Sequence, residues 1–300
     1  SWSVEATPVS GTLAHTPNDD DVCEGTAVWA TLTPGSGGNG ADETEYRTHD
    51  GADWNAWDTY VSEAEIATAG IGAVEIRTRR LADHCAPDDY NTVSWSVEAT
   101  PVSGTLARTP NDDDVCEGTP VSATLTPGSG GNGADETEYR THDGADWSAW
   151  DTYVSEAEIA TAGIEAVEIR TRRTADHCVP DDYNTVSWSV EEAPVSGALT
   201  RNPDDDVCEG TAVSATLTPG SGGNGTDETE YRTHDGADWS AWDTYVSEAE
   251  IPTAGIEAVE IRTRRTADHC TPDDYNTVSW SVEATPVSGT LARTPNDDDV

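Results

Sequence analysis

The fold of this chain is decided by one stretch, Thr44–Arg80, which reads TEYRTHDGADWNAWDTYVSEAEIATAGIGAVEIRTRR. The stretch returns almost unchanged at Thr137–Arg173 and again at Thr229–Arg265. Fixed points outside it give the period, because Trp2, Trp95, Trp188 and Trp280 lie 93, 93 and 92 residues apart. Self-similarity at a fixed period makes the repeat the unit of structure. The 300 residues therefore hold three modules and a fraction rather than one large domain.

Short segments in which apolar and polar residues alternate fill each module. Within the first copy they are Thr44–Thr48, Trp57–Val61 and Val74–Arg79, and Ala27–Thr33 and Thr92–Glu98 flank them. A period of two is typical of a half-buried strand. The HDGAD sequence between two of these segments predicts an Asp-Gly turn that joins two strands. We predict an all-β fold, a tandem array of antiparallel β-sandwich (Ig-like) modules with about seven short strands each.

Module boundaries follow from the positions of the cysteines and the strand patterns. We assign residues 1–22 to the end of a preceding module plus a connector, 23–98 to module 1, 99–115 to a connector or first strand, 116–191 to module 2, 192–207 to a connector or first strand, 208–283 to module 3, and 284–300 to a connector into a further module. The chain opens inside a strand pattern, SWSVE, and ends at NDDDV, where the other copies continue to Cys. We therefore expect a segment of a longer array. The PGSGGNG sequence predicts a flexible loop or hairpin connection, and without a lysine or a following helix it does not indicate a phosphate site.

The composition is strongly acidic. Fifty-eight Asp and Glu stand against fifteen basic residues, all of them Arg, and the formal net charge is −43. Such a charge repels nucleic acid and disfavours contact with an anionic membrane surface. No apolar run approaches the ~18 residues that a membrane-spanning helix requires. The charge fits a highly solvated exterior protein whose modules repel one another and stay extended.

Four motifs carry a resemblance to a known group of proteins. They are CEGTAVSATLTPGSGGNG, EYRTHDGADWSAWDTYVS, VEIRTRRTADHC and YNTVSWSVE. Together they resemble the tandem immunoglobulin-like or fibronectin-like repeats of very large secreted bacterial surface proteins, and the resemblance covers essentially the whole chain. It implies a role as a stalk, an adhesin or a fibre-forming protein. The chain departs from a typical member by its lack of Lys and its many Asp and Glu.

The cysteines occur as one pair per module, and the two members of each pair are 62 residues apart. The pairs are Cys23 and Cys85, Cys116 and Cys178, and Cys208 and Cys270. An even, module-matched count in an extracellular setting predicts disulfides. We expect them to close within modules. A competing scheme joins neighbours, Cys85 to Cys116 and Cys178 to Cys208, and it stays open because a first strand at GTLAR would place the two cysteines of one module at opposite poles. A zinc site at His84 and Cys85 would lack a second close ligand pair.

Acidic clusters near the module boundaries are candidate calcium ligands. Calcium takes six to eight oxygen ligands, commonly from flexible loops, so an ion at a boundary would rigidify the array. The candidate ligands are Asp19, Asp20, Asp21, Glu24, Asp88, Asp89, Asp112, Asp113, Asp114, Asp181 and Asp182. Solvated surface charge is the alternative interpretation. No cofactor is required by the sequence, and calcium is the only ion that it suggests.

A WxxW motif and a pair of alternating arginines recur in every module. On a strand the two arginines point to the same face, so their guanidinium planes can interleave with the indoles, and each cation–π contact contributes about 0.5–2 kcal/mol. The residues are Trp54, Trp57, Arg77 and Arg79, then Trp147, Trp150, Arg170 and Arg172, then Trp239, Trp242, Arg262 and Arg264. WSAW resembles the tryptophan–arginine ladders of thrombospondin repeats and cytokine receptors. Sugar binding by exposed tryptophans is the alternative.

Two smaller signals complete the candidate sites. Asn224 begins the only N-x-T acceptor for an N-linked sugar. His49 and Asp50 form a pair that could suggest acid–base chemistry, but the pair lies in a predicted turn without a partnered nucleophile. We interpret it as a turn and expect no enzyme.

The function that we expect from the sequence is structural. The chain would be a repeat segment of an extracellular or cell-surface stalk or filament, built from acidic, disulfide-linked modules that contact mainly their neighbours, with strand exchange between neighbours as one way to build a fibre. Its partners would be neighbouring modules or copies of itself. The alternative is a glycan-binding adhesin that uses Trp and acidic calcium loops.

Overall fold

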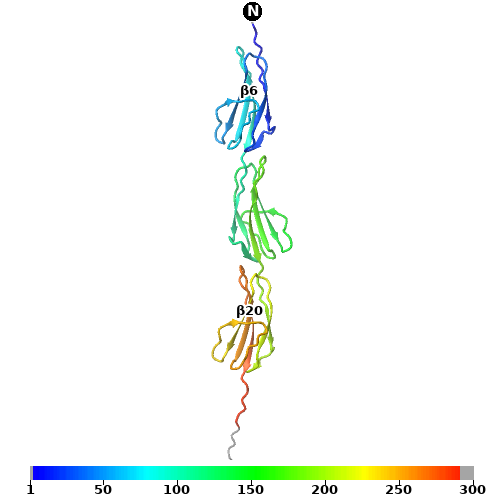
Figure 1. The fold of residues 1–300 in the computed structure, drawn as a ribbon, viewed down its shortest axis with the longest axis vertical. Coiled ribbons are helices and arrows are strands. Elements are labelled where there is room, and N and C mark those ends of the chain that lie inside the picture. Colours follow the sequence, from blue (N-terminus) through cyan, green and yellow to red (C-terminus); the bar gives the residue numbers. More distant parts are fainter. Residues whose placement is uncertain (1–2, 291–300) are drawn as a thin grey trace, which may run out of the picture.

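The computed structural model describes residues 3–290, and they form three similar modules that follow one another in a row (Figure 1). The predicted strand copy around Trp2 and the final NDDDV lie outside the described residues. All the regular elements of residues 3–290 are strands, and no helix there is long and apolar enough to span a membrane.

Each module contains seven strands at equivalent positions. In module 1 they are β1 (Thr12–Thr16), β2 (Asp21–Cys23), β3 (Trp29–Thr33), β4 (Asp42–His49), β5 (Asp58–Thr59), β6 (Ala73–Arg80) and β7 (Asn91–Glu98). In module 2 they are β8 (Thr105–Thr109), β9 (Asp114–Cys116), β10 (Ser122–Thr126), β11 (Asp135–His142), β12 (Asp151–Thr152), β13 (Ala166–Arg173) and β14 (Asn184–Glu191). In module 3 they are β15 (Ala198–Asn202), β16 (Val207–Cys208), β17 (Ser214–Thr218), β18 (Asp227–His234), β19 (Asp243–Thr244), β20 (Ala258–Arg265) and β21 (Asn276–Glu283).

Two sheets make up each sandwich. The larger sheet has the order β5-β4-β6-β7-β2, in which β2 runs parallel to β7 and the other neighbours are antiparallel. The smaller sheet pairs β1 with β3, and a bridge between Val28 and Ile66 extends it. In immunoglobulin nomenclature the larger sheet is C′-C-F-G and the smaller is A-B-E, with the first strand divided between the two sheets. The strand order thus confirms the predicted Ig-like sandwich.

The segment before each first cysteine belongs to the module that follows it. β8 pairs with β10 over five residues, and β9 joins the edge of the larger sheet beside β14. Leu106 of β8 packs against the core of module 2. Residues 99–115, assigned from the sequence to a connector or first strand, therefore supply β8 and the first two residues of β9 in the second sandwich, and 192–207 supply β15 and the first residue of β16 in the third.

The core of each module is small and centred on a tryptophan. Trp95 is 1% exposed, and Val28, Val74 and Ile76 are fully buried around it. The indole Nε1 of Trp95 donates a hydrogen bond to the carbonyl oxygen of Pro17, 3.1 Å away. The alternation in β6 is as predicted, because every second residue from Val74 points into the core. Apolar contacts hold the two sheets of each module together. Within residues 3–290, no disulfide joins two cysteines of the same module.

Candidate functional site

The disulfides join successive modules. Cys23 of module 1 bonds Cys178 of module 2, and Cys116 of module 2 bonds Cys270 of module 3; the Cα atoms are 4.8 Å apart in both pairs. The expected closure within modules is wrong, and so is the competing scheme of Cys85 with Cys116 and Cys178 with Cys208. In residues 3–290, Cys85 and Cys208 are free thiols.

Strand direction explains why a module cannot close on itself. Cys23 lies beside Glu98 at the end of β7, whereas Cys85 precedes Asn91, where β7 begins. An eight-residue strand separates its two ends by about 23 Å, far beyond the ~4.4–6.8 Å that a disulfide requires between Cα atoms. The first cysteine of one module instead meets the loop after the sixth strand of the next, at the junction between the two modules.

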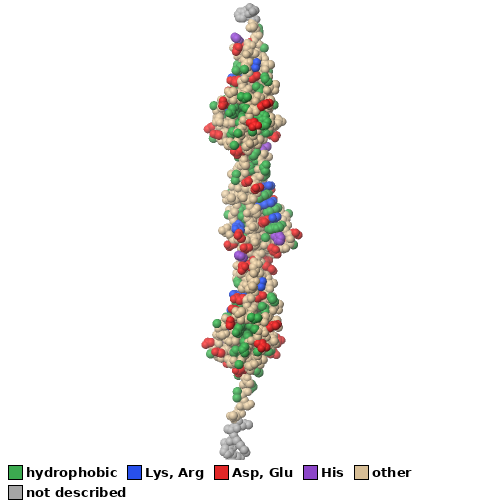
Figure 2. Space-filling model, in the orientation of Figure 1, with side chains coloured by type: hydrophobic (Ala, Val, Ile, Leu, Met, Phe, Trp, Pro, Cys, Tyr) green, Lys and Arg blue, Asp and Glu red, His purple; other side chains and the backbone are tan. Residues whose placement is uncertain are grey.

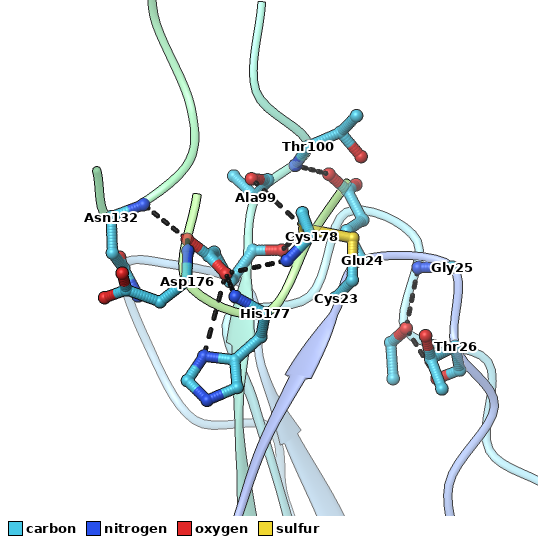
Figure 3. The surroundings of a disulfide bond; sticks show 12 residues. Cys23, Glu24, Gly25, Thr26, Ala99, Thr100, Asn132, Asp176, His177 and Cys178 are labelled. Carbon is cyan, nitrogen blue, oxygen red and sulfur yellow. Dashed lines mark hydrogen bonds and ion pairs between the residues drawn. A yellow bond between two sulfur atoms is a disulfide. The ribbon is translucent and has the colours of Figure 1, made fainter. Parts of the chain in front are cut away.

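A buried carboxylate lies beside each disulfide. The side chain of Glu98, the last residue of β7, is 1% exposed. It accepts hydrogen bonds from four backbone amides of module 2, those of Asn132 (2.5 Å), Asp176 (3.0 Å), His177 (2.5 Å) and Cys178 (3.1 Å) (Figure 3). Burial by itself would raise the pKa of Glu98, but these amides outweigh it and lower the pKa below its ordinary value. The carboxylate is therefore held ionised inside the junction.

The second junction repeats this arrangement. Glu191 ends β14 and accepts hydrogen bonds from the backbone amides of Asn224, Asp268, His269 and Cys270 in module 3. Burial is again outweighed by the amides, so the pKa of Glu191 is lowered as well. Two junctions with the same contacts show that the attachment of one module to the next is a repeated feature.

The glycine-rich loop wraps around the linker between modules. The amide of Gly131 donates a hydrogen bond of 2.8 Å to the carbonyl oxygen of Ala99. A Cβ atom on Gly130, whose φ is +67°, would lie 2.1 Å from the carbonyl oxygen of Thr100. Only glycine allows this φ together with this close approach. The loop that the sequence predicts to be flexible is therefore one side of the junction.

A second carboxylate reaches the linker from the preceding module. Glu24, next to Cys23, accepts hydrogen bonds from the amides of Gly70 at 2.6 Å and Thr100 at 3.3 Å. These bonds lower its pKa. Glu24, a candidate calcium ligand, thus contributes to the first junction through backbone amides.

The other candidate calcium ligands are divided between the two poles of each module. Asp88 and Asp181 accept hydrogen bonds from the amides of Ser10 (2.8 Å) and Ser103 (2.7 Å), and these bonds lower the pKa of both carboxyl groups. Asp113 forms an ion pair with Arg108. Asp89 and Asp182 directly follow Asp88 and Asp181. The remaining candidates lie just before β2 and β9 or at the first residue of these strands, and they are Asp19, Asp20, Asp21, Asp112 and Asp114. In residues 3–290 no three His, Cys, Asp or Glu residues are arranged to hold a metal ion, and calcium binding stays a prediction.

The predicted Trp and Arg residues lie in one stack on the outer face of the larger sheet. The Arg47 guanidinium lies 4.4 Å from the ring centroids of both Trp54 and Trp57, and Arg77 lies 3.7 Å from that of Trp57. Arg77 and Arg79 then contact the ring of Tyr90 at 4.0 and 4.4 Å. Figure 2 shows the alternating blue and green side chains of the corresponding stack on the middle module. The stack is thus six side chains long in each module.

Sequence reasoning missed Arg47 and Tyr90, the second and fifth members of this stack. Arg47 alternates with Tyr46 along β4 and faces Glu75, so the strand pattern could have placed it on the outer face. Tyr90 lies in the loop before β7, where no periodicity applies. Its hydroxyl donates a hydrogen bond of 2.8 Å to Glu43. Burial, followed by the hydrogen bond to Glu43, raises the pKa of Tyr90 to about 12.

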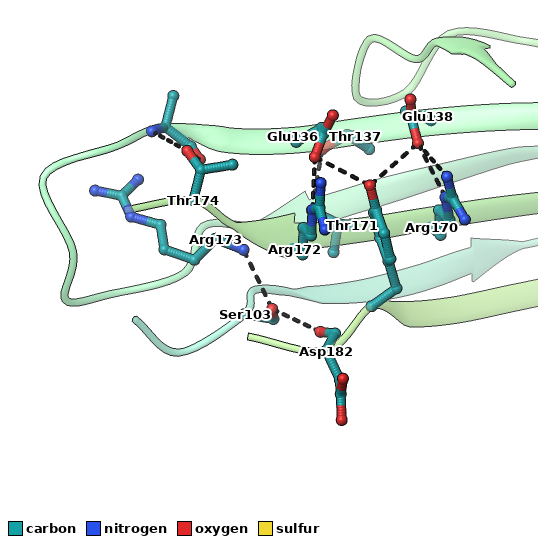
Figure 4. Close-up of polar contacts among 12 residues, drawn as sticks. Ser103, Glu136, Thr137, Glu138, Arg170, Thr171, Arg172, Arg173, Thr174 and Asp182 are labelled. Atoms are coloured by element: carbon teal, nitrogen blue, oxygen red, sulfur yellow. Dashed lines mark hydrogen bonds and ion pairs between the residues drawn. The ribbon is translucent and has the colours of Figure 1, made fainter. Parts of the chain in front are cut away.

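Ion pairs between neighbouring strands hold the arginines of the stack in place. In module 2, Arg170 binds Glu138 through two nitrogens at 2.7 and 2.9 Å, and Arg172 binds Glu136 at 2.6 Å (Figure 4). The stack residues of modules 2 and 3 repeat those of module 1: Arg140, Trp147, Trp150, Arg170, Arg172 and Tyr183, then Arg232, Trp239, Trp242, Arg262, Arg264 and Tyr275. Partly exposed pairs contribute little singly, but here each guanidinium is fixed on both an aromatic ring and a carboxylate.

The remaining candidate residues lie in turns and loops. Asp50 accepts hydrogen bonds from the amides of Ala52 and Asp53, both 2.9 Å, and His49 accepts one from Gly51. The predicted HDGAD turn is therefore confirmed. Asn224 is exposed in the glycine-rich loop of the second junction, and its glycosylation stays a prediction.

Comparison with known proteins gives similarity of structure only. No protein-family model and no curated protein matches the chain. Among solved structures, three N-terminal domains of the outer capsid protein Hoc of bacteriophage RB49 are similar with 11% identity and a TM-score of 0.34, covering 92% of this chain and 100% of that one. The ectodomain of mouse nectin-like molecule 4 has 10% identity, a TM-score of 0.37 and coverages of 90% and 99%. A D1–D4 fragment of ICAM-5 has 13% identity, a TM-score of 0.37 and coverages of 90% and 76%. The class of this chain, a tandem immunoglobulin-like array, rests on its own strand order.

Proposed function

We propose that this chain is a structural segment of an extracellular stalk or filament, in which covalent junctions hold immunoglobulin-like modules in line. The observation that carries the proposal is the junction itself, where a disulfide and a buried carboxylate occur together twice. Structural disulfides persist in oxidising surroundings outside the cytosol. The proposal includes that these modules are repeats of a large secreted surface protein.

The junction leaves little freedom between modules. Domains joined by a polar linker normally move relative to each other. Here β7 ends at Glu98, and the next residue, Ala99, is already bonded to the glycine-rich loop of module 2. Val102 forms a bridge with Ser129 three residues before β8 begins at Thr105. The linker is therefore part of the second module along most of its length.

The disulfide stabilises this arrangement over a very long loop. The sequence separation of Cys23 and Cys178 is 155 residues. In the chain-entropy model, closing such a loop stabilises the folded state by about 5 kcal/mol. Because the two cysteines belong to different modules, the stabilisation applies to the docked pair of modules. A rod built in this way resists bending as well as unfolding.

Acidity and the aromatic stacks support a structural role in a different way. A net charge of −43 keeps parallel rods apart in solution. Two guanidinium groups contact the ring of Trp57, at 4.4 and 3.7 Å, and this leaves less of the indole for stacking with a sugar. The contacts of Trp57 therefore do not favour glycan binding, although Trp54 stays 37% exposed. The strand that we considered for exchange, β8, pairs within its own chain.

Electron microscopy of single molecules tests the proposal. We call the two disulfides between modules, Cys23–Cys178 and Cys116–Cys270, the staples. The variant Cys23→Ala with Cys116→Ala lacks both staples, and the matched control Cys85→Ala with Cys208→Ala keeps them. We expect the control to give straight rods with a narrow distribution of angles between adjacent modules, and the first variant to give a broader one. Equally broad distributions for the two proteins would show that the staples do not set the shape, and the proposal would fail.

A further inference from the structure

Each glycine-rich loop contains an Asn-Gly pair, and two of these pairs lie at the module junctions. They are Asn132–Gly133 at the first junction and Asn224–Gly225 at the second. The side chains of Asn132 and Asn224 are exposed. In an Asn-Gly pair the backbone nitrogen of the glycine can attack the side-chain amide of the asparagine, because glycine places no Cβ atom in the way. Both pairs therefore have the chemistry of a deamidation site.

The two groups that would react at the first junction are not engaged elsewhere. Within residues 3–290, neither the backbone amide of Gly133 nor the side chain of Asn132 takes part in a hydrogen bond. The attacking nitrogen and the carbon that it attacks are thus both available. Their meeting depends on the backbone, because ring closure requires rotation about the Cα–C bond of Asn132.

Docking of the two modules holds the chain on one side of this bond. The Asn132 amide donates a hydrogen bond of 2.5 Å to the carboxylate of Glu98, which ends β7 of module 1. The amide of Gly131 donates one of 2.8 Å to the carbonyl oxygen of Ala99 in the linker. An opened junction would lose both contacts.

Module 2 itself holds the chain on the other side of the bond. The Ala134 amide donates a hydrogen bond of 3.0 Å to Oγ1 of Thr174. Gly133 lies against the same residue, because a Cβ atom on Gly133 would be 2.2 Å from that oxygen. These contacts lie within module 2 and do not require docking. The Asn132–Gly133 peptide is therefore fixed on both sides in the docked state and on one side only when the junction opens.

The second junction has the same arrangement. The Asn224 amide donates a hydrogen bond of 2.5 Å to Glu191, and the Gly223 amide donates one of 2.9 Å to the carbonyl oxygen of Glu192. Beyond the Asn-Gly pair, the Thr226 amide is bonded to Oγ1 of Thr266 at 2.9 Å. The chain thus provides two equivalent sites, each under the control of its own junction.

We propose that Asn132 and Asn224 are deamidation sites that a docked junction protects, and that deamidation at an opened junction hinders its closure. The glycine nitrogen attacks Cγ of the asparagine, the bond between Cγ and Nδ2 breaks, and ammonia leaves with the proton of the glycine amide. Water then opens the resulting succinimide ring at either of its two carbonyl carbons, which gives aspartate or isoaspartate. An opening of the junction is thereby converted into a lasting chemical change.

The product opposes docking for two reasons. A carboxylate replaces a neutral amide on the residue whose backbone amide holds the ionised Glu98, and like charges at close range repel. Isoaspartate also carries one additional methylene group in the backbone, next to a loop that fits the linker so closely that Gly130 has no room for a Cβ atom. The inference concerns the junction alone and does not depend on an extracellular role.

The two junctions of one molecule provide the test and its control. The chain is produced in a host that adds no N-linked sugar, so that Asn224 stays unmodified, and is incubated in mildly alkaline buffer. Digestion and mass spectrometry then give the rate of deamidation at each site. Local opening sets the rate, so Glu98→Ala, which removes an ionic acceptor of the junction, should accelerate deamidation of Asn132 about tenfold and leave the rate at Asn224 unchanged.

Two other variants separate protection by docking from a local effect of the Glu98 charge. Glu191→Ala should accelerate deamidation of Asn224 and leave Asn132 unchanged. Cys23→Ala removes the first staple without altering a charge and should also accelerate deamidation at Asn132 alone. Equal rates at Asn132 in the unchanged chain and in both first-junction variants would show that docking does not protect the site. Absence of deamidation at Asn132 in these variants would overturn its assignment as a site.

Hydrogen exchange tests the consequence for closure. Asn132→Asp places the aspartate product in every molecule. It should speed exchange of the His177 amide, which is bonded to Glu98, on the order of fivefold, and it should not affect the His269 amide, which is bonded to Glu191. Asn224→Asp should have the reverse effect. Unchanged exchange at both amides in both variants would refute the claim that deamidation hinders closure.

Discussion

Pulling on the two ends of the chain should extend it far less than its length allows. The loop closed by Cys23 and Cys178 and the loop closed by Cys116 and Cys270 overlap between Cys116 and Cys178. Every residue from 24 to 269 therefore lies inside at least one closed loop. Under tension the load passes through the staples, and most of the polypeptide carries none of it.

The size of the effect follows from the shortest covalent path between residues 3 and 290. With both disulfides in place, the path runs to Cys23, crosses to Cys178, returns to Cys116, crosses to Cys270 and continues to the end, about 102 residues in all. At ~3.4 Å per residue this is roughly 350 Å. Without the disulfides the path is about 287 residues, or roughly 980 Å at the same rise. Reduction should thus lengthen the fully unfolded chain almost threefold.

Single-molecule force spectroscopy with handles at the two ends measures this length directly. The variant Cys178→Ala keeps one staple and leaves a path of about 133 residues, so it should stop at roughly 450 Å. Cys208→Ala is the matched control and should behave as the unchanged chain. Oxidised molecules that extend to the same length as reduced ones would refute the staple pattern and the load path derived from it.

Two further predictions concern the junction. Because the pKa of Glu98 is lowered in the folded state, its contribution to docking is fully present above its ordinary pKa of about 4.5 and is lost as the pH falls through the folded value. In a chain without the disulfides, the distribution of angles between modules should therefore broaden in acid. Glu98→Gln should abolish this pH dependence and should not broaden the distribution further in acid. Gly130→Ala forces a methyl group against the carbonyl oxygen of Thr100. It should destabilise the first junction by about 1–3 kcal/mol, measured as a lower midpoint of thermal unfolding. Gly163→Ala is the control and should lower the midpoint less, because φ is also positive there but no atom lies within 4 Å.

Local patterns were sufficient for the strands and turns. The alternation around Val74 and Ile76 identified the buried face of β6, because a strand turns successive side chains to opposite sides. The HDGAD turn follows from the hydrogen bonds that Asp50 makes with amides two and three residues ahead. The same alternation placed Arg77 and Arg79 together on the outer face beside Trp57, although it did not reveal Tyr90, which enters the stack from a loop.

The sequence by itself determined the module, its repeat and the two faces of its strands, since these depend on neighbours within a few residues. Only the tertiary structure decided the partners of the cysteines. The spacing of 62 residues between Cys23 and Cys85 is the same in every copy, and it says nothing about the pole at which each thiol lies. That depends on β2 running parallel to β7, a contact between strands nearly a whole module apart. The burial of Glu98 and the role of the glycine-rich loop follow from the same docking of one module on the next.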